Sequence, residues 1–292
     1  MSKFFDQTQR AQDWSGREGL AKKLDIAHVL DSVKDTIKVA DSVGVEMSEH
    51  RLDRCRKFVL PRPEDGPTLI AHGDANQVAA EAYRTLRTRL VRLQTTSGIR
   101  SVVFSSAVPG EGKTLTTLNT GICCAQLHEM RVLVIDGDLR TRGLSKLIGS
   151  PSGPGLSDIL AGRVQYHDAI LSTDQPNLYV LPGGSPAGAP PELFAGEHWK
   201  EFLGWAGETF KLILVDAPPI LGLSDFDLMA TGCDGVLTVV RANQTKRQLL
   251  RKAATQIDPK KNLGVIFNAT QSDVHKSYYH AYYSGSGNGH QK

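Results

Sequence analysis

The stretch from Ser101 to Thr117, SVVFSSAVPGEGKTLTT, constrains the fold more than any other part of the chain. An apolar run breaks at a glycine-rich turn, and a helical pattern follows. The turn has the spacing of a phosphate-binding loop of the Walker A type, with Ala107 in place of the usual first glycine. The amides of such a loop surround the phosphates of a nucleotide, at the positive end of the helix beginning near Thr114. A Gly/Pro turn that happens to end in Gly-Lys-Thr is the alternative, and the flanking strand and helix argue against it.

The residues of this loop predict a nucleotide and Mg²⁺ as ligands. Lys113 is expected to reach the β- and γ-phosphates, and the hydroxyl of Thr114 is expected to hold Mg²⁺. The expected ATP-binding residues form one continuous run: Ala107, Val108, Pro109, Gly110, Glu111, Gly112, Lys113, Thr114 and Leu115.

Two further apolar runs end in acidic residues. RVLVID, residues 131–136, leads into Asp136-Gly137-Asp138, and KLILVD, residues 211–216, ends at Asp216 in the form of a Walker B strand. The carboxyl ends of such strands are where open α/β sheets bind ligands. A single aspartate there is more often a helix cap or turn residue. A pair directly after a buried strand instead favours a metal or catalytic site.

The order of the remaining patterns predicts the fold class. Strands are expected at 101–106, 131–136, 177–181, 211–216, 234–241 and 263–268, and helices at 78–94, 114–128, 155–162, 191–208 and 244–257. Strands that alternate with helices imply right-handed crossovers and a parallel sheet. We therefore expect an α/β protein of the P-loop NTPase class, with a mostly parallel central sheet and helices on both faces.

Three regions are expected. Residues 1–69 are polar with a Pro-rich exit and are predicted to be an N-terminal extension and linker with one amphipathic helix between Leu20 and Ile37, whose apolar face packs on the main domain or docks on another protein. The P-loop domain is expected over 70–271. A flexible tail over 272–292 holds four of the seven tyrosines, where exposure suits modification or partner binding. These are Tyr278, Tyr279, Tyr282 and Tyr283.

Composition narrows the function classes. The formal net charge of +3 is too small to indicate a nucleic-acid partner. No apolar run approaches the length of a membrane span, and the polar start lacks the apolar centre of a secretion signal, so we expect a cytoplasmic location. The four cysteines show no metal-ligand spacing. The adjacent pair, Cys123 and Cys124, falls within an apolar helical pattern, where reduced core thiols are expected.

Several motifs together resemble the bacterial tyrosine kinases, the P-loop enzymes of polysaccharide export and capsule assembly, over about residues 70–283. EAYRTLR is similar to that family's E-x-x-R-x-x-R oligomerisation motif, PGEGKT to its Walker A loop, VLVIDGDLR to its Walker A′ motif and LILVDAPPI to its Walker B motif. The tyrosine cluster is similar to the family's autophosphorylation site. Spacing alone favours a solvated face for Glu81, Arg84 and Arg87, but the resemblance makes these three residues a subunit contact.

The resemblance implies an ATP-dependent protein-tyrosine autokinase that phosphorylates its own tail in trans and regulates exopolysaccharide or capsule polymerisation and export. Lys113 would neutralise the transferred phosphoryl group. Thr114 and Asp138 would hold Mg²⁺, and Asp216 would support the metal site. Asp136 would be the base for the tyrosine hydroxyl or would orient it. Implied partners are further copies of the chain, a tyrosine phosphatase and a separate membrane adaptor of the polysaccharide co-polymerase type. That adaptor would hold the kinase at the inner face of the cell membrane.

The chain departs from the family pattern at two places. Thr141-Arg142-Gly143 stands where the family commonly has a proline, and no membrane-spanning pair precedes residue 70.

The sequence leaves two alternative functions open. One is a partition or positioning ATPase of the same fold, although Val108 occupies the place of the signature lysine that is usual in those enzymes. The other is a nucleotide-gated scaffold without transferase activity.

Overall fold

The computed structural model describes residues 52–61, 69, 77–186 and 188–270. The chain divides into two compact units, residues 1–47 and 48–292, and every described residue belongs to the second. The expected helix between Leu20 and Ile37 and the four tail tyrosines lie outside the described residues.

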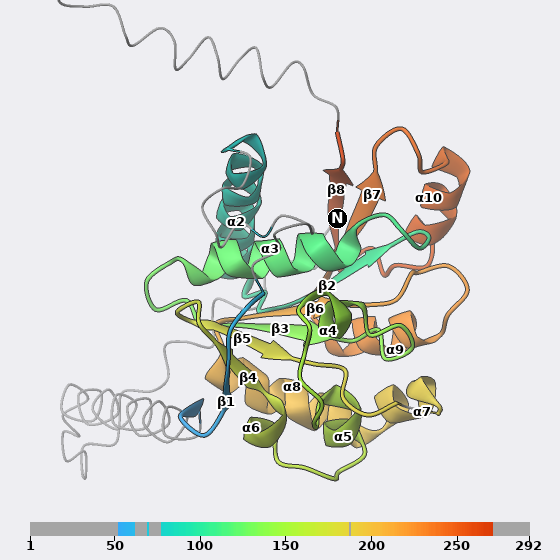
Figure 1. Ribbon diagram of the computed structural model, residues 1–292. Coiled ribbons are helices and arrows are strands. Elements are labelled where there is room, and N and C mark those ends of the chain that lie inside the picture. Colours follow the sequence, from blue (N-terminus) through green and yellow to red (C-terminus); the bar gives the residue numbers. More distant parts are fainter. Residues whose placement is uncertain (1–51, 62–68, 70–76, 187, 271–292) are drawn as a thin grey trace, which may run out of the picture. The chain divides into compact units, whose positions relative to one another are not determined.

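The described residues form a sheet of eight strands in the order β1-β4-β5-β3-β6-β2-β7-β8 (Figure 1). Neighbouring strands run parallel except β4 and β5, which pair antiparallel. The mostly parallel α/β fold expected from the sequence is therefore confirmed. The strands are β1 (Arg56–Phe58), β2 (Ser101–Ser106), β3 (Val132–Asp136), β4 (Leu171–Thr173), β5 (Leu178–Leu181), β6 (Leu212–Asp216), β7 (Gly235–Arg241) and β8 (Asn262–Asn268).

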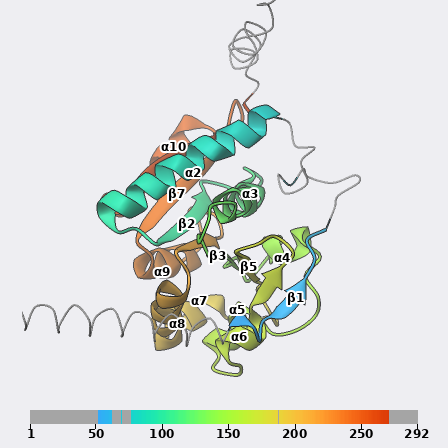
Figure 2. The ribbon, with the colours of Figure 1, turned by 90° about the vertical axis from the view of Figure 1, so that its left-hand side faces the viewer.

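Helices cover both faces of the sheet. In Figures 1 and 2, α2 and α3 lie on one face, and α7, α8 and α9 lie on the other. The helices are α2 (Gln77–Ser97), α3 (Lys113–Ala125), α4 (Gly143–Leu147), α5 (Leu156–Leu160), α6 (Tyr166–Ala169), α7 (Pro190–Ala195), α8 (Glu197–Thr209), α9 (Asp225–Gly232) and α10 (Arg247–Ala254).

Two apolar cores result from this layering, one on each face of the sheet. In β2, Val102 and Phe104 pack into the core under α2, α3 and α4, while Val103 packs into the core shared with α5, α7, α8 and α9. Side chains alternate in this way because successive residues of a strand point to opposite faces. Burying each of these side chains stabilises the fold by roughly 1.5–3 kcal/mol. The central strands β2, β3 and β6 are buried along their whole length and apolar at their centres.

Several short elements differ from the sequence-based expectation. β1 lies within residues 1–69, and its flanking residues Leu52, Cys55 and Leu60 are buried, so the sheet extends into the segment predicted to be linker. The helix predicted over 191–208 was wrong as a single element, because Gly196 is extended (ψ 166°) and separates α7 from α8. β4, α4, α6 and α9 were not predicted. They contain three to eight residues, too few for a clear periodic pattern.

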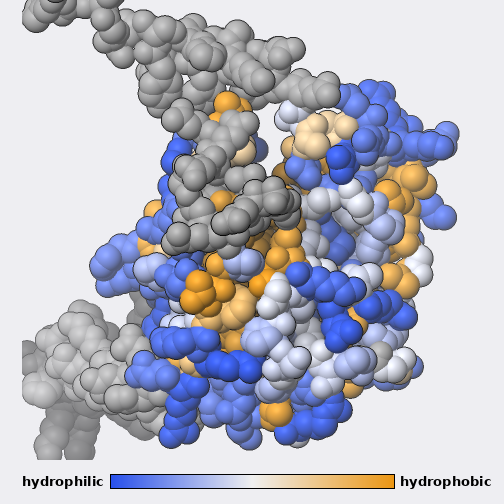
Figure 3. Space-filling view, in the orientation of Figure 1, coloured by the Kyte–Doolittle hydropathy of each residue, from blue (hydrophilic) through white to orange (hydrophobic). Residues whose placement is uncertain are grey.

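Polar residues are exposed on the face drawn in Figure 3, and the thiol groups are buried. Hydrophilic residues line most of the lower edge of the face in Figure 3, below the sheet. None of the helices in the described ranges is both long and apolar enough to cross a bilayer. The cysteines are all free and buried, so the prediction of reduced core thiols is confirmed.

Candidate nucleotide and phosphoryl-transfer site

Strand order brings the predicted site residues together. β3, β6 and β2 are neighbours in the sheet, and the DGD turn, Asp216 and the phosphate loop follow at the same edge. Asp136 and Asp216 are directly paired across β3 and β6. The residues Asp136, Asp138 and Asp216 are 0–2% exposed, so three acidic residues lie buried at one sheet edge.

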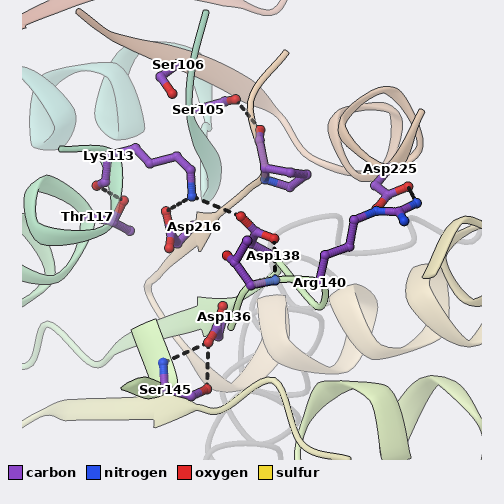
Figure 4. Close-up of polar contacts among 12 residues, drawn as sticks. Ser105, Ser106, Lys113, Thr117, Asp136, Asp138, Arg140, Ser145, Asp216 and Asp225 are labelled. Atoms are coloured by element: carbon purple, nitrogen blue, oxygen red, sulfur yellow. Dashed lines mark hydrogen bonds and ion pairs between the residues drawn. The ribbon is translucent and has the colours of Figure 1, made fainter. Parts of the chain in front are cut away.

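Lys113 lies between two of these carboxylates (Figure 4). Its Nζ is 3.3 Å from Oδ2 of Asp138 and 3.4 Å from Oδ1 of Asp216. Burial by itself would lower the pKa of Lys113, but the two neighbouring carboxylates outweigh burial and raise it. The lysine is therefore a fixed positive charge, aimed at the strand tips rather than at solvent.

Asp136 has a different environment from the other two acids. Its Oδ2 accepts hydrogen bonds from the backbone N–H (2.8 Å) and the hydroxyl (2.6 Å) of Ser145 in α4. Burial, followed by the charge of Asp216, raises the pKa of Asp136 to about 7, against the effect of the Ser145 hydrogen bonds. A carboxylate with such a pKa is well matched to accept a proton near neutral pH.

The pKa of Asp216 is also raised, but the neighbouring Lys113 opposes this shift. Burial raises its pKa to about 6, while Lys113 and the hydroxyl of Thr114 act in the opposite direction. The three acids therefore fall into two groups, with Asp138 and Asp216 bound to Lys113 and Asp136 held separately by Ser145. A division of this kind is how sites assign different roles to neighbouring carboxylates.

The loop between β2 and α3 has the backbone of a phosphate cradle. Gly110 and Gly112 have φ of 83° and 87°, a region that residues with a Cβ rarely adopt. Among the residues that the structure describes, none accepts a hydrogen bond from the amides of Gly110, Glu111 and Gly112. These donors stand directly before the N-terminus of a 13-residue helix, where anions bind favourably.

Side chains from β7, β8 and the segment after β7 hold this loop in place. The carboxylate of Glu111, 3% exposed, accepts a bond from the hydroxyl of Thr245 and one of 3.3 Å from the amide of Val108. Asn268 donates to the carbonyl of Glu111 at 2.9 Å, and Arg241 donates to that of Gly110 at 3.3 Å. The loop shape therefore depends on residues more than 130 positions further along the chain.

The turn after β3 is fixed in a similar way. Arg140 makes a two-pronged ion pair with the buried Asp225 of α9, with Nε–Oδ2 and Nη2–Oδ1 distances of 2.8 and 3.1 Å (Figure 4). Within the turn, Oδ1 of Asp138 accepts from the amide of Thr141 at 3.1 Å. These contacts hold Asp138 toward Lys113 where the family's usual proline is absent.

One of the expected magnesium ligands, Asp216, has a buried oxygen that accepts no hydrogen bond from the described residues. Oδ1 of Asp136 and Oδ2 of Asp216 are buried and have no hydrogen-bond partner among the described residues. In those same ranges no group of three or more His, Cys, Asp or Glu side chains forms a complete metal cage. Mg²⁺ typically takes one or two carboxylates, substrate phosphates and several waters. Asp216 fits as one such carboxylate, whereas both oxygens of Asp138 already accept hydrogen bonds, from Lys113 and from the amide of Thr141.

The predicted interface residues lie on α2, away from the strand tips. Glu81 and Arg84 form an exposed ion pair of 2.8 Å within the helix. Arg87 donates to the carbonyl of Cys123 at 3.1 Å, near the C-terminus of α3, where a cation is favoured by the helix dipole. Arg87 therefore also joins α2 to the helix that carries the phosphate loop.

Sequence reasoning missed the residues that position the site. Ser145, Asp225, Thr245, Arg241 and Asn268 contact the acids or the loop, but they come from separate elements and share no spacing with them. Of the residues that position the site, only Arg140 belongs to a motif recognised in the sequence, DGDLR. The loop, the sheet order and the buried acids together define a P-loop nucleotide-binding protein.

Comparisons with known proteins identify the family. No known family profile matches the chain. The tyrosine-protein kinase YwqD of Bacillus subtilis strain 168 is 29% identical over 226 residues, which are 77% of this chain and 94% of YwqD. The tyrosine-protein kinase Wzc of Salmonella typhimurium strain LT2 is 33% identical over 173 residues, 59% of this chain and only 24% of Wzc.

A solved structure agrees with these relatives. The crystal structure of the VpsO kinase domain superposes with a TM-score of 0.58 at 30% identity, over 67% of this chain and 97% of that domain. The chain belongs to the bacterial tyrosine kinase family. Its relatives are named tyrosine-protein kinases, which favours this family over the partition or positioning ATPase considered from the sequence.

Proposed function

We propose that this protein is an ATP-dependent protein-tyrosine kinase that phosphorylates the tyrosine cluster of its own tail. The observation that supports this most is the arrangement of Lys113 between Asp138 and Asp216, with Asp136 held separately beside them. A nucleotide-gated scaffold would need the loop and the lysine. It would not need a further buried carboxylate with a pKa near neutrality.

In the proposed reaction, the tyrosine oxygen forms a bond to the γ-phosphorus of ATP while the bond from that phosphorus to the bridging oxygen breaks, and ADP leaves. Tyrosine has an ordinary pKa near 10, so its proton must leave during the attack. Asp136 accepts this proton, or orients the hydroxyl that loses it. Lys113 and the loop amides hold the phosphates in position and balance their charge, which supplies most of the catalysis in phosphoryl transfer.

Thr114, Asp138 and Asp216 are the residues that would hold Mg²⁺. When bound, the ion would neutralise charge on the β- and γ-phosphates. Lys113 already contacts two of these residues, so the same side chains would serve the lysine and the ion.

The direct test uses the full chain with ATP and Mg²⁺. We expect mass spectrometry to find phosphotyrosine on the peptide that contains Tyr278 to Tyr283, and to find none when EDTA removes the metal. A variant with phenylalanine at all four positions is the control, because it keeps the site and lacks the acceptors. A tail without phosphotyrosine under the complete conditions, with ATP binding intact, would refute the kinase function.

We further propose that phosphorylation takes place between copies of the chain that meet through α2. The double variant Arg84→Ala/Arg87→Ala is expected to lower the mass measured by light scattering and the trans-phosphorylation rate together. Arg87→Ala alone also loosens α2 from α3, so thermal melting of both single variants must accompany the measurement. An unchanged light-scattering mass in the folded double variant would remove the interface proposal.

The remaining partners follow from the proposed kinase function. A separate membrane adaptor of the polysaccharide co-polymerase type would bring the chain to the membrane, and a tyrosine phosphatase would reverse the reaction. The process served would be exopolysaccharide or capsule polymerisation and export.

A further inference from the structure

An open pocket, referred to below as the cavity, lies beside Ser145, the residue that holds the proposed base. It has a volume of about 310 Å³. Ser145, whose hydroxyl donates to Asp136 at 2.6 Å, forms part of its wall and accepts a hydrogen bond of 2.9 Å from the amide of Gly183. One side chain therefore separates the cavity from the carboxylate. Its lining residues are Arg142, Ser145, Lys146, Gly149, Ser150, Pro151, Ser152, Gly153, Pro182 and Gly184.

The charged lining of this cavity is cationic. Arg142 and Lys146 both line it, and Arg56 donates to the carbonyl of Ser152 in its wall at 3.4 Å. None of these three cations forms an ion pair with a carboxylate within the described ranges. The nearby Arg140 and Arg163, in contrast, are paired with Asp225 and Asp158.

Arg142 is held in a costly backbone conformation. Its φ of 51° is left-handed, a region that residues with a Cβ rarely adopt. Its amide donates to the carbonyl of Asp138 at 2.7 Å, and its Nη1 donates to the carbonyl of Gly184 at 3.2 Å. Strained residues of this kind persist where the surrounding structure determines them, and they cluster at ligand sites.

We propose that the cavity binds a phosphotyrosine side chain in the tail of a second copy of the chain. This inference rests on the proposed kinase function. The tyrosines come as two adjacent pairs, so the product of one transfer is a group of charge about −1.5 to −2 within a few residues of the next acceptor. Arginine and lysine are the side chains that bind such a phosphate.

The tail tyrosines are close enough in sequence for two of them to lie near Ser145, which both lines the pocket and donates to Asp136. An extended chain covers about 3.3–3.6 Å per residue, so these tyrosines, one to five positions apart, span roughly 3–18 Å. One phosphorylated tyrosine in the cavity would hold the tail while a neighbouring tyrosine lies at Asp136. The first phosphate would thereby favour the next transfer.

The test measures binding and needs no catalysis. Fluorescence anisotropy follows a labelled peptide of residues 272–286, with and without phosphate on Tyr279, on the full chain carrying phenylalanine at all four tail tyrosines. We expect the phosphopeptide to bind about 10-fold more tightly or better, the effect of at least one charge-assisted hydrogen bond. Lys146→Ala and Arg142→Asn should each remove most of this difference, and asparagine tolerates the left-handed φ.

Controls separate the subsite from general charge effects. Lys200→Ala, on the exposed surface of α8, should keep the full preference for the phosphopeptide. Equal binding of both peptides would overturn the proposal. Competition by inorganic phosphate as effective as that by the phosphopeptide would also overturn it, because the site would then read a free anion. The two proposals can fail separately. If the unchanged chain does not phosphorylate its tail, but the phenylalanine variant still prefers the phosphopeptide, the kinase function is refuted and the binding site is not.

Discussion

Replacing Lys113 by methionine is expected to lower the rate of tail phosphorylation by at least about 10²–10³-fold. The lysine is the only side-chain cation that contacts Asp138 and Asp216 in the described part of the chain, and it is expected to reach the phosphates as well. Removing it takes away a fixed charge that cannot be replaced by water at a buried strand tip. Mass spectrometry of the tail peptide at saturating ATP measures the loss.

Binding and folding must be measured beside this activity. Calorimetry with ATP should show an affinity weakened by roughly 10–100-fold, the effect of losing a hydrogen bond to a charged group. Lys252→Met, an exposed lysine on α10, is the matched control and should leave both values unchanged. If Lys113→Met and the unchanged chain gave equal tail phosphate, self-catalysis through this site would be disproved.

Replacing Gly112 by alanine is expected to weaken ATP binding by about 30-fold or more. A left-handed alanine costs about 1–2 kcal/mol, and a Cβ at this position would collide with the side-chain amide of Asn268. The collision displaces either the loop or its hydrogen bond to the end of β8, so a further loss of similar size is expected. Calorimetry with a non-hydrolysable ATP analogue measures the affinity.

Gly110 supplies the matched control for this effect. Its φ of 83° is almost the same, but a Cβ there meets no atom within 4 Å. Gly110→Ala should therefore show only the backbone cost and a clearly smaller loss. The double variant Gly112→Ala/Asn268→Ala should recover part of the affinity if the collision is the cause. Equal losses at Gly110 and Gly112 would contradict this explanation.

Much of the fold was predictable because its central strands are buried on both faces. The runs that became β2, β3 and β6 are buried at every position and have apolar centres, and a glycine or acidic signal stands at or after the carboxyl end of each. Such runs are long enough to be recognised without neighbours. The edge of the sheet was different. β1 and β4 contain three residues each and depend on strand pairing, β1 with β4 and β4 with both β1 and β5.

The candidate site divides in the same way. Lys113, Asp136, Asp138 and Asp216 stand at strand and helix ends that local sequence marks, and the sheet order brings them together. Ser145 carries no such mark. It lies nine residues after Asp136, in a helix of five residues, and its role depends on how α4 folds back against β3.

The sequence by itself determined the class of the protein, because a phosphate loop and two acidic strand ends are local patterns with few other uses. Only the tertiary structure decided how those acids differ. Asp136 and Asp216 end similar apolar runs, yet Ser145 holds one and Lys113 the other. Charge and burial at a buried site depend on contacts between distant segments, and local patterns do not encode those contacts.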